Sequence, residues 1–389
     1  MTLLNLLSII SFYYYRASIS NSIKFTLRSS MSLTYICFII WAALSFFYAI
    51  NPTEVIVNIT RQVNVLIMFL SMAILVYAIK NNRQIIPWII TIILCIELYA
   101  VFAEAIDMIN TSGQINPGFL KGVTANRNIT AFSIAIKVPF ILFLIHKLNK
   151  LKFKLFLGSI VFLSFLSLTM IQSRASFLAV GIIFISFTTL QIFFLIKAKK
   201  NIFQVFQMGY IIIPLIAAVI INQTFFANKG ADAISRAASI SLSTKDGSVN
   251  QRLRYYEDVL THVKSNPIFG TGLGNWKIKS IDYDSKDIVG YIVPYHAHSD
   301  FIQLGAELGI IGFLLYLGIF IWAIYYVYIL IRFSKISLEE KVFLFLMLTS
   351  LGVYSIDANL NFPIARPQVL VVWTLIMSLI AVYYQKYLY

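Results

Sequence analysis

Long, continuous apolar runs constrain the fold more than any other feature of the sequence. A helix needs roughly 20 mostly apolar residues to cross about 30 Å of hydrocarbon. Runs of this length lie near residues 31–50, 63–79, 85–106, 129–146, 155–172, 176–196, 203–222, 309–331, 342–357 and 368–385. Because 59% of the residues are hydrophobic and only 12% are charged, a soluble globular protein is excluded.

The membrane-spanning elements are predicted to be helices. Only helices and closed barrels satisfy backbone hydrogen bonds in lipid, and these runs lack the period of two that barrel strands show. We therefore predict an all-α integral membrane protein with about ten to twelve transmembrane helices. Residues 3–15 are short for a crossing and lack a signal-peptide cleavage pattern. An eleventh span and an interfacial helix are both compatible with this segment.

Basic loops predict the orientation, because short loops rich in lysine and arginine stay preferentially in the cytoplasm. The basic set comprises Arg16, Lys24 and Arg28, then Lys80 and Arg83, the stretches KLNKLKFK and KAKK, RFSK with Lys341, and Lys386. Segment 223–300 then forms a large loop that faces outward, away from the cytoplasm. We predict one polytopic membrane domain over residues 1–389, with this loop as a cap within it. The net charge of +15 is mostly a topology signal, and no nucleic-acid partner is expected.

The large loop contains one amphipathic helix by its spacing. Within residues 250–264, Leu253, Tyr256, Leu260 and Val263 recur at steps of three and four and predict the packed face. The stretch SNP is expected to end this helix, and GTGLG predicts a tight turn.

Neither a disulfide nor a metal site is indicated. Cys37 and Cys95 lie inside predicted spans, and His146, His262, His296 and His298 are too scattered for zinc-ligand spacing. We expect no metal and no cofactor.

Three outward-facing arginines are candidates for phosphate binding. Arg174 lies in SRAS between two spans, and Arg252 and Arg254 lie in NQRLRYY. A planar guanidinium binds phosphate through two parallel hydrogen bonds, so arginines near the outer leaflet suit a lipid-linked diphosphate. Contact with lipid headgroups and snorkelling are the alternatives.

A histidine stands at the predicted start of a late span. Asp300 with Gln303 resembles a helix start, so His298 lies just before the first turn. The helix dipole disfavours protonation there, and a neutral imidazole can accept a proton. If the helix instead includes His298, Gly305, Gly309 and Gly312 form a bare stripe beneath it.

Lys137 lies inside a predicted span, where an ionisable group is a functional candidate by default. Pairing with a carboxylate such as Glu104 or Asp107 on the preceding helix is the structural alternative.

The spacing around His298 resembles a family signature. His298-Ser299, nine residues and then Gly309-Ile310-Ile311-Gly312 resemble the signature of the bacterial O-antigen ligase and polymerase superfamily. The stretches GVTANRNITAF, SRAS, QRLRYYEDVLTHVKSNPIFGTGLGN and LNFPIARP look similar in the same order. The resemblance covers roughly residues 115–370, and it departs at Tyr256, where the family commonly has tryptophan.

The resemblance implies a GT-C-like membrane glycosyltransferase in the bacterial inner membrane, with its active site facing the periplasm. Its donor would be a glycan on undecaprenyl diphosphate, and its acceptor a hydroxyl of lipid A-core within lipopolysaccharide biosynthesis, among membrane lipids. It implies His298 as general base, Arg174 and Arg252 as a clamp on the diphosphate, and metal-independent transfer. Implied substrate-binding residues are Arg254, His296, Asn126, Asn128, Gly309 and Gly312.

Two further functions are compatible with the sequence. A surface-polysaccharide polymerase would use the same donor, and the compact chain with one large outer loop favours the ligase over it. A flippase or other transporter has similar spans, but such proteins commonly carry internal repeats, and none is visible in the sequence.

Overall fold

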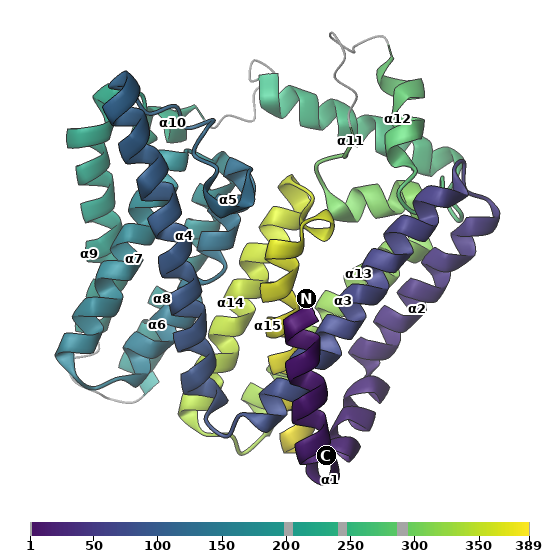
Figure 1. Cartoon of the computed structure of the whole chain (residues 1–389), viewed down its shortest axis with the longest axis horizontal. Helices are drawn as coiled ribbons and strands as arrows, with labels where there is room; N and C mark the ends of the chain where they lie inside the picture. Colours follow the sequence, from purple (N-terminus) through teal and green to yellow (C-terminus); the bar gives the residue numbers. More distant parts are fainter. Residues whose placement is uncertain (1, 198–204, 240–246, 286–294, 389) are drawn as a thin grey trace. The chain divides into compact units, whose positions relative to one another are not determined.

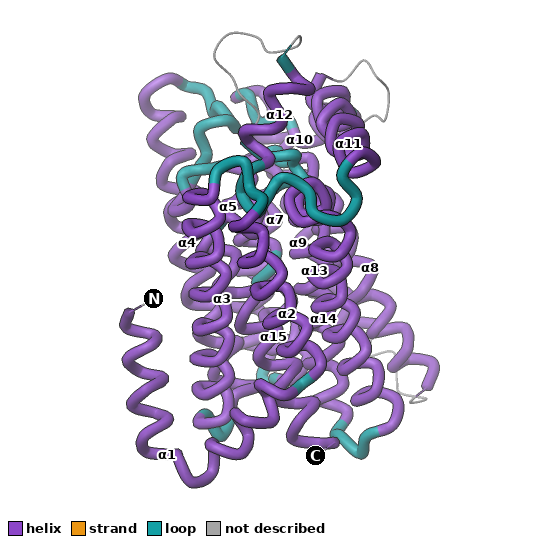
Figure 2. Tube along the Cα trace, turned by 90° about the vertical axis from the view of Figure 1, so that its right-hand side faces the viewer, coloured by secondary structure: helices purple, strands orange, loops and turns teal. Residues whose placement is uncertain are grey.

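The computed structural model describes residues 2–197, 205–239, 247–285 and 295–388. These residues form helices joined by loops, and no strand occurs among them (Figure 2). Within these ranges, ten helical segments are long and apolar enough to cross a membrane, and they correspond one to one with the predicted spans. The prediction of an all-α integral membrane protein is confirmed. Residues 3–15 belong to α1, a 27-residue helix that is not among those ten.

The chain divides into two compact units, whose helices are labelled in Figure 1. Unit 1 comprises residues 1–80, 241–335 and 358–389, and unit 2 comprises residues 81–240 and 336–357. Unit 1 contains α1 (Thr2–Arg28), α2 (Ser30–Leu44), α3 (Pro52–Ala78), α11 (Gly247–Ser265), α12 (Trp276–Asp284), α13 (Asp300–Phe333) and α15 (Pro367–Leu388). Unit 2 contains α4 (Asn82–Ser112), α5 (Arg127–Ala135), α6 (Val138–Lys147), α7 (Leu151–Ile171), α8 (Arg174–Lys197), α9 (Val205–Ile221), α10 (Ala233–Ala238) and most of α14 (Leu338–Leu360). The single membrane domain stays a prediction.

Helix α13 is broken at Gly309, whose φ of 67° and ψ of −171° are not helical. The break releases backbone carbonyl groups inside a predicted span. The loop that follows α11 supplies hydrogen-bond partners for these carbonyl groups. The N–H groups of Thr271 and Gly272 donate to the carbonyl oxygens of Ala306 and Glu307 at 3.0 and 2.8 Å. Broken helices persist in membranes only when their backbone groups are satisfied in this way.

The same loop and helix α2 also contact the residues on either side of Gly309. The Ile310 N–H donates to the Pro267 carbonyl oxygen at 2.8 Å, and the indole of Trp41 on α2 donates to the Leu308 carbonyl oxygen at 2.9 Å. A β-carbon at Gly309 would collide with the carbonyl oxygen of Ile268. Glycine is therefore required at this position by both its φ and its surroundings.

Helix α11 ends at Ser265, before Asn266-Pro267, as the sequence predicts. Its buried face agrees with the prediction only in part: Val263 packs against a buried cluster that includes Val259 and Trp276, but Leu253 and Leu260 are 48% and 52% exposed. Tyr255, Val259 and His262 are buried instead. The two polar-tipped rings tolerate burial because each has a partner: Gln251 donates to the Tyr255 hydroxyl at 2.7 Å, and His262 Nδ1 lies 3.1 Å from the Tyr283 hydroxyl.

Unit 2 contains a buried ion pair at a helix interruption. Helix α5 ends and α6 begins around Lys137, where Pro139 lacks the N–H that would continue the helix. The Lys137 ammonium lies 2.8 Å from both Glu97 oxygens and 2.7 Å from the Ser133 carbonyl and hydroxyl oxygens. Its partner is therefore Glu97, and the expectation of Glu104 or Asp107 is wrong. Glu104 instead accepts from the backbone of Lys121 and Gly122.

Ion pairs join three loops of unit 2 that are predicted to be cytoplasmic. Lys147 lies 2.9 Å from Glu339, and Arg83 lies 3.5 Å from Glu340 and 3.6 Å from Glu339. These loops therefore meet at one end of the unit, as the alternation of basic loops requires.

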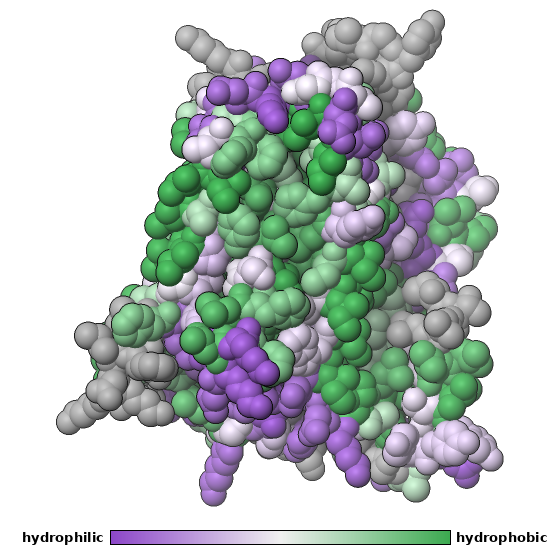
Figure 3. Space-filling model, turned by 60° about the vertical axis from the view of Figure 1, so that its left-hand side comes forward, coloured by the Kyte–Doolittle hydropathy of each residue, from purple (hydrophilic) through white to green (hydrophobic). Residues whose placement is uncertain are grey.

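The exposed surface has the character of a membrane protein. On the face drawn in Figure 3, hydrophobic residues occupy a broad middle band and hydrophilic residues gather toward both ends. Helix α4 exposes a row of large apolar side chains at steps of three and four residues. This row consists of Ile85, Ile89, Ile92, Ile96 and Tyr99. Such a stripe suits contact with lipid.

We predict that Gly309→Ala destabilises the protein by roughly 2 kcal/mol or more, because alanine is strained at this φ and its β-carbon meets the Ile268 carbonyl. Thermal unfolding of the purified chain, followed by tryptophan fluorescence, measures the effect. Gly181→Ala on α8 is the matched control, since nothing lies within 4 Å of its added β-carbon. Equal midpoints for the two variants would contradict the described break.

We predict that Lys137→Met alone costs about 3–5 kcal/mol, because it leaves the Glu97 carboxylate buried without its counter-charge. The double variant Lys137→Met/Glu97→Leu should recover most of the loss. Unfolding midpoints and glycan-transfer activity are both measured. If the double variant folds as well as the wild type but is inactive, Lys137 has a functional role and the purely structural interpretation is wrong.

Candidate functional site

His298 stands directly before the first turn of α13, as predicted. The helix begins at Asp300, and Ser299 is its N-cap, accepting from the Ile302 N–H at 3.4 Å. His298 itself has a φ of 57°, which turns the chain sharply before the cap. Because the helix does not extend back through His298, the alternative of one continuous helix with a glycine stripe is wrong. Gly309 forms the break described above, and Gly312 packs its α-carbon against the Leu308 side chain.

The His298 ring is held between aromatic side chains of unit 1. It stacks on Tyr255 with 6.2 Å between centroids and meets Phe362 edge to face at 5.5 Å. Tyr256 fixes the backbone, because its hydroxyl lies 3.1 Å from the His298 carbonyl oxygen and 2.7 Å from that of Asn359. Tyr256 therefore ties α11 to both the histidine and the end of α14.

The imidazole of His298 is neutral at physiological pH. Burial lowers its pKa to about 4, the nearby charge of Arg252 contributes in the same direction, and a hydrogen bond with the Leu360 backbone opposes them. Its buried Nδ1 has no hydrogen-bond partner among the described residues. A neutral ring with an unoccupied nitrogen is suited to accepting a proton.

Arg252 and Arg254 lie on α11 and differ in their surroundings. Arg252 is close enough for its charge to lower the pKa values of both His298 and Tyr256. The guanidinium of Arg254 lies over the Tyr255 ring at 5.6 Å. Arg252 is therefore the better placed of the two to act beside the histidine.

His296 lies beside His298 in a second aromatic contact. Its ring stacks on Phe362 with 4.1 Å between centroids. Burial lowers its pKa to about 4, while a hydrogen bond with Gln303 raises it and the charges of Arg366, His298 and Arg61 lower it further. The two histidines thus share Phe362, and His296 faces a cavity.

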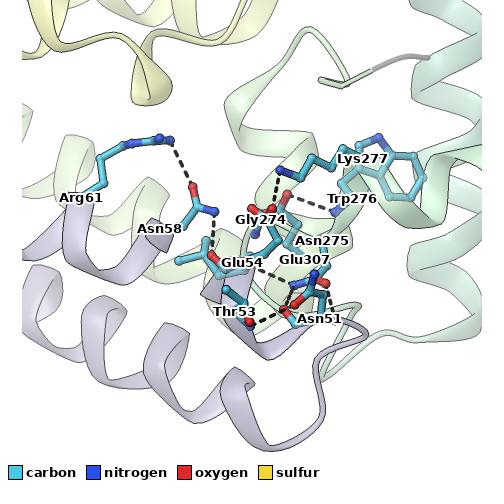
Figure 4. A network of polar contacts seen from close by, with 11 residues as sticks. Asn51, Thr53, Glu54, Asn58, Arg61, Gly274, Asn275, Trp276, Lys277 and Glu307 are labelled. Carbon is cyan, nitrogen blue, oxygen red and sulfur yellow. Dashed lines mark hydrogen bonds and ion pairs between the residues drawn. The ribbon is translucent and has the colours of Figure 1, made fainter. Parts of the chain in front are cut away.

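This cavity has a volume of about 400 Å³ and lies entirely within unit 1. Its wall is formed by the first turns of α3, residues 273–277, residues 295–307 and residues 364–366. Figure 4 shows the polar network along one side, where Arg61 reaches Asn58 at 3.1 Å and Lys277 pairs with Glu54 at 2.8 Å. The Asn275 side chain joins this side to the loop before α3, accepting from the Asn51 N–H at 2.7 Å.

The carboxylate of Glu307 lies in the cavity wall, two residues before the α13 break. It accepts from the N–H groups of Gly274 and Trp276 at 2.8 and 3.3 Å and from the Gln303 side chain at 3.0 Å. A buried carboxylate that accepts several N–H bonds is well stabilised. Through these hydrogen bonds Glu307 holds the loop that contains Gly270, Gly272 and Gly274 against α13.

Two cavity arginines, Arg61 and Arg366, are absent from the sequence-predicted site. Arg61 lies within the apolar helix Pro52–Ala78, where an ionisable group is a signal for function, but it falls two residues before the span predicted at 63–79. Arg366 precedes Pro367 in the LNFPIARP stretch. Arg366 stacks on Phe362 at 4.6 Å. Burial lowers its pKa and the charge of Arg61 lowers it further, so the two guanidinium groups influence one another.

Arg174, Asn126 and Asn128 belong to unit 2. Arg174 begins α8 and donates to the Ser239 hydroxyl at 3.2 Å. The Asn126 side chain caps α5 by accepting from the N–H groups of Asn128 and Ile129 at 2.9 and 3.3 Å. The predicted substrate roles of all three residues stay predictions.

Comparison with known families gives one match within the chain. Residues 159–317 match the family model described as O-antigen ligase. This match, which covers less than half of the chain, supports an assignment to the O-antigen ligase/polymerase superfamily. No curated protein matches the chain.

The matched region runs from α7 into α13. It contains Arg174, Arg252, Arg254, His296 and His298. It excludes Asn126, Asn128, Arg61 and Arg366. The O-antigen ligase match supports a ligase or polymerase in general that acts on lipid-linked polysaccharide in a membrane.

Metal binding by a side-chain cluster finds no support in the described part of the chain. No group of three or more His, Cys, Asp or Glu side chains there is arranged to hold an ion. Metal independence of the reaction stays a prediction.

We predict that stability falls as the pH is lowered from about 7 toward 5, partly through the two histidines. Their folded pKa values of about 4 lie below the 6.5 of an ordinary histidine. Unfolding therefore takes up protons in this range, and the folded state loses stability as the pH falls. The double variant His296→Gln/His298→Gln should show a flatter curve of unfolding midpoint against pH. Parallel curves for the variant and the wild type would show that the histidines do not titrate in this way.

Proposed function

We propose that this protein is an O-antigen ligase that transfers a glycan from undecaprenyl diphosphate to a sugar hydroxyl of lipid A-core. The reaction would take place at the periplasmic face of the inner membrane. The neutral His298 beside Arg252, just before a helix whose first half lies within the O-antigen ligase match, is the observation that carries this proposal.

The chemistry follows from these two side chains. An acceptor hydroxyl oxygen forms a bond to the anomeric carbon while the bond between that carbon and the diphosphate oxygen breaks. His298 takes the hydroxyl proton on a ring nitrogen, and undecaprenyl diphosphate leaves with the bonding electron pair. Arg252 is suited to stabilise the charge that grows on the leaving group.

The roles of Arg174 and Arg252 as a diphosphate clamp rest on their chemistry. Guanidinium groups bind diphosphate oxygens through paired hydrogen bonds and remain charged at all relevant pH values. Once arginines neutralise the diphosphate, it leaves readily without a divalent cation. The proposed reaction is therefore metal-independent, and chelator should leave the activity of the purified protein unchanged.

A low pKa also suits the proposed base. Since its pKa is about 4, His298 is unprotonated throughout the neutral range and can accept a proton without first losing one. A protonated imidazole at this position would repel Arg252 and could not act as a base. Burial, assisted by the charge of Arg252, thus keeps the histidine in its competent form.

We predict that His298→Ala lowers transfer at saturating donor by about 10²–10⁴-fold, the range of a lost general base. Arg252→Ala and Arg174→Ala should both weaken donor binding and slow transfer. The assay uses purified full-length chain, defined undecaprenyl-diphosphate glycan and purified lipid A-core. Arg332→Ala is the control, because Arg332 is exposed near the opposite end of α13.

The acceptor decides between the two branches of the superfamily. Transfer to lipid A-core supports the ligase, whereas growth of carrier-linked glycan without lipid A-core transfer identifies a polymerase. Full activity of His298→Ala would refute the base assignment in either case.

A further inference from the structure

The cavity of unit 1 contains two cations without a carboxylate partner. Among the described residues, neither Arg61 nor Arg366 takes part in an ion pair. Arg61 donates to the Asn58 side chain, and Arg366 lies against the Phe362 ring. Both guanidinium groups line the cavity and keep further N–H donors, since each arginine has five.

The carboxylates of the same cavity each contact another group of the protein. Glu54 pairs with Lys277, Asp300 accepts from the Ile364 N–H at 2.9 Å, and Glu307 accepts from two backbone groups and Gln303. Two close, partly desolvated guanidinium groups repel each other until an anion arrives. This arrangement favours an anionic ligand over a cation or an apolar molecule.

The remaining wall suits a sugar better than a bare anion. Asn58, Gln62 and Gln303 contribute side-chain amides to the wall. Asn58 and Gln303 already use each amide atom once within the protein, but an amide has two N–H donors and two acceptor lone pairs, so each keeps capacity for a sugar hydroxyl. Gln62 uses its carbonyl oxygen for the Tyr35 hydroxyl at 3.0 Å, which leaves its N–H₂ for other partners. Tyr295 is 64% exposed and lines the cavity, where its ring offers a flat apolar face. The volume of about 400 Å³ lies in the range of small-molecule sites.

We propose that this cavity binds an acidic saccharide unit, with Arg61 and Arg366 holding its carboxylate or phosphate group and the side-chain amides contacting its hydroxyl groups. The inference deepens the proposed function and rests on it, because it assigns a charge class to a saccharide that the transferase handles. His296 lines this cavity and shares Phe362 with His298, so one aromatic ring links the cavity wall to the proposed base.

Binding is measured on the full-length chain in uncharged detergent by isothermal titration or saturation-transfer NMR. The probes are glucuronate, glucose 6-phosphate, glucose and inorganic phosphate. We expect both acidic sugars to bind at least roughly tenfold more tightly than glucose, as charge-assisted hydrogen bonds imply. Inorganic phosphate should bind more weakly than glucose 6-phosphate, because it lacks the hydroxyl contacts.

Arg61→Gln and Arg366→Gln should each raise the dissociation constant for acidic sugars by roughly tenfold. Arg332→Gln is the matched control and should bind as the wild type does. Arg61→Lys and Arg366→Lys keep the charge but lose the planar fork, so they should show a smaller loss. These conservative variants test the proposal even if a glutamine variant fails to fold.

Three results would overturn the inference: equal affinity for glucose and glucuronate, wild-type binding in all four cavity variants, or inorganic phosphate binding as tightly as glucose 6-phosphate. Because no turnover is involved, a chain that binds acidic sugars but transfers no glycan would refute only the proposed function. An active transferase without a preference for acidic sugars would refute only this inference.

Discussion

The docking of residues 267–275 onto the broken α13 determines where the groups of unit 1 lie. A helix interrupted at Gly309 exposes carbonyl groups that water does not reach, and the loop amides of Thr271 and Gly272 satisfy two of them. The segment of α13 before the break begins two residues after His298 and contains Glu307 near its end. One set of backbone hydrogen bonds therefore positions the proposed base and one wall of the cavity together. Loss of the glycine would disturb both, although neither group touches it through its side chain.

The elements that depend on local physics could be predicted from the sequence. Ten spans follow from the length that a helix needs in hydrocarbon, and the start of α13 follows from its polar residues before an apolar run. The end of α11 follows from Asn266-Pro267, and Gly270, Gly272 and Gly274 all adopt the left-handed backbone of a tight turn. The break at Gly309 was not predictable, since glycines are common in regular transmembrane helices and its cause is a loop distant in sequence.

The features that depend on tertiary register could not be predicted in the same way. Glu97 and Glu104 lie two turns apart on α4, and the sequence does not determine which of them is level with Lys137. The face of α11 was misjudged because hydrophobicity alone ranks Leu253 above His262, whereas the burial of His262 depends on a hydroxyl from Tyr283. Arg61 and Arg366 meet only after folding, so their common cavity has no signature along the chain.

The cationic groups of unit 1 serve two requirements through one electrostatic effect. Positive charges near an imidazole lower its pKa, so Arg252 favours the proton-accepting form of His298, and Arg366 and Arg61 act likewise on His296. The same charges attract anionic substrates. Binding an anion partly neutralises them, which would raise the histidine pKa values and favour proton transfer from an acceptor hydroxyl. The affinity of His298 for a proton would thereby increase when substrate is bound, so a base with a very low pKa in the free protein can still be effective in the complex.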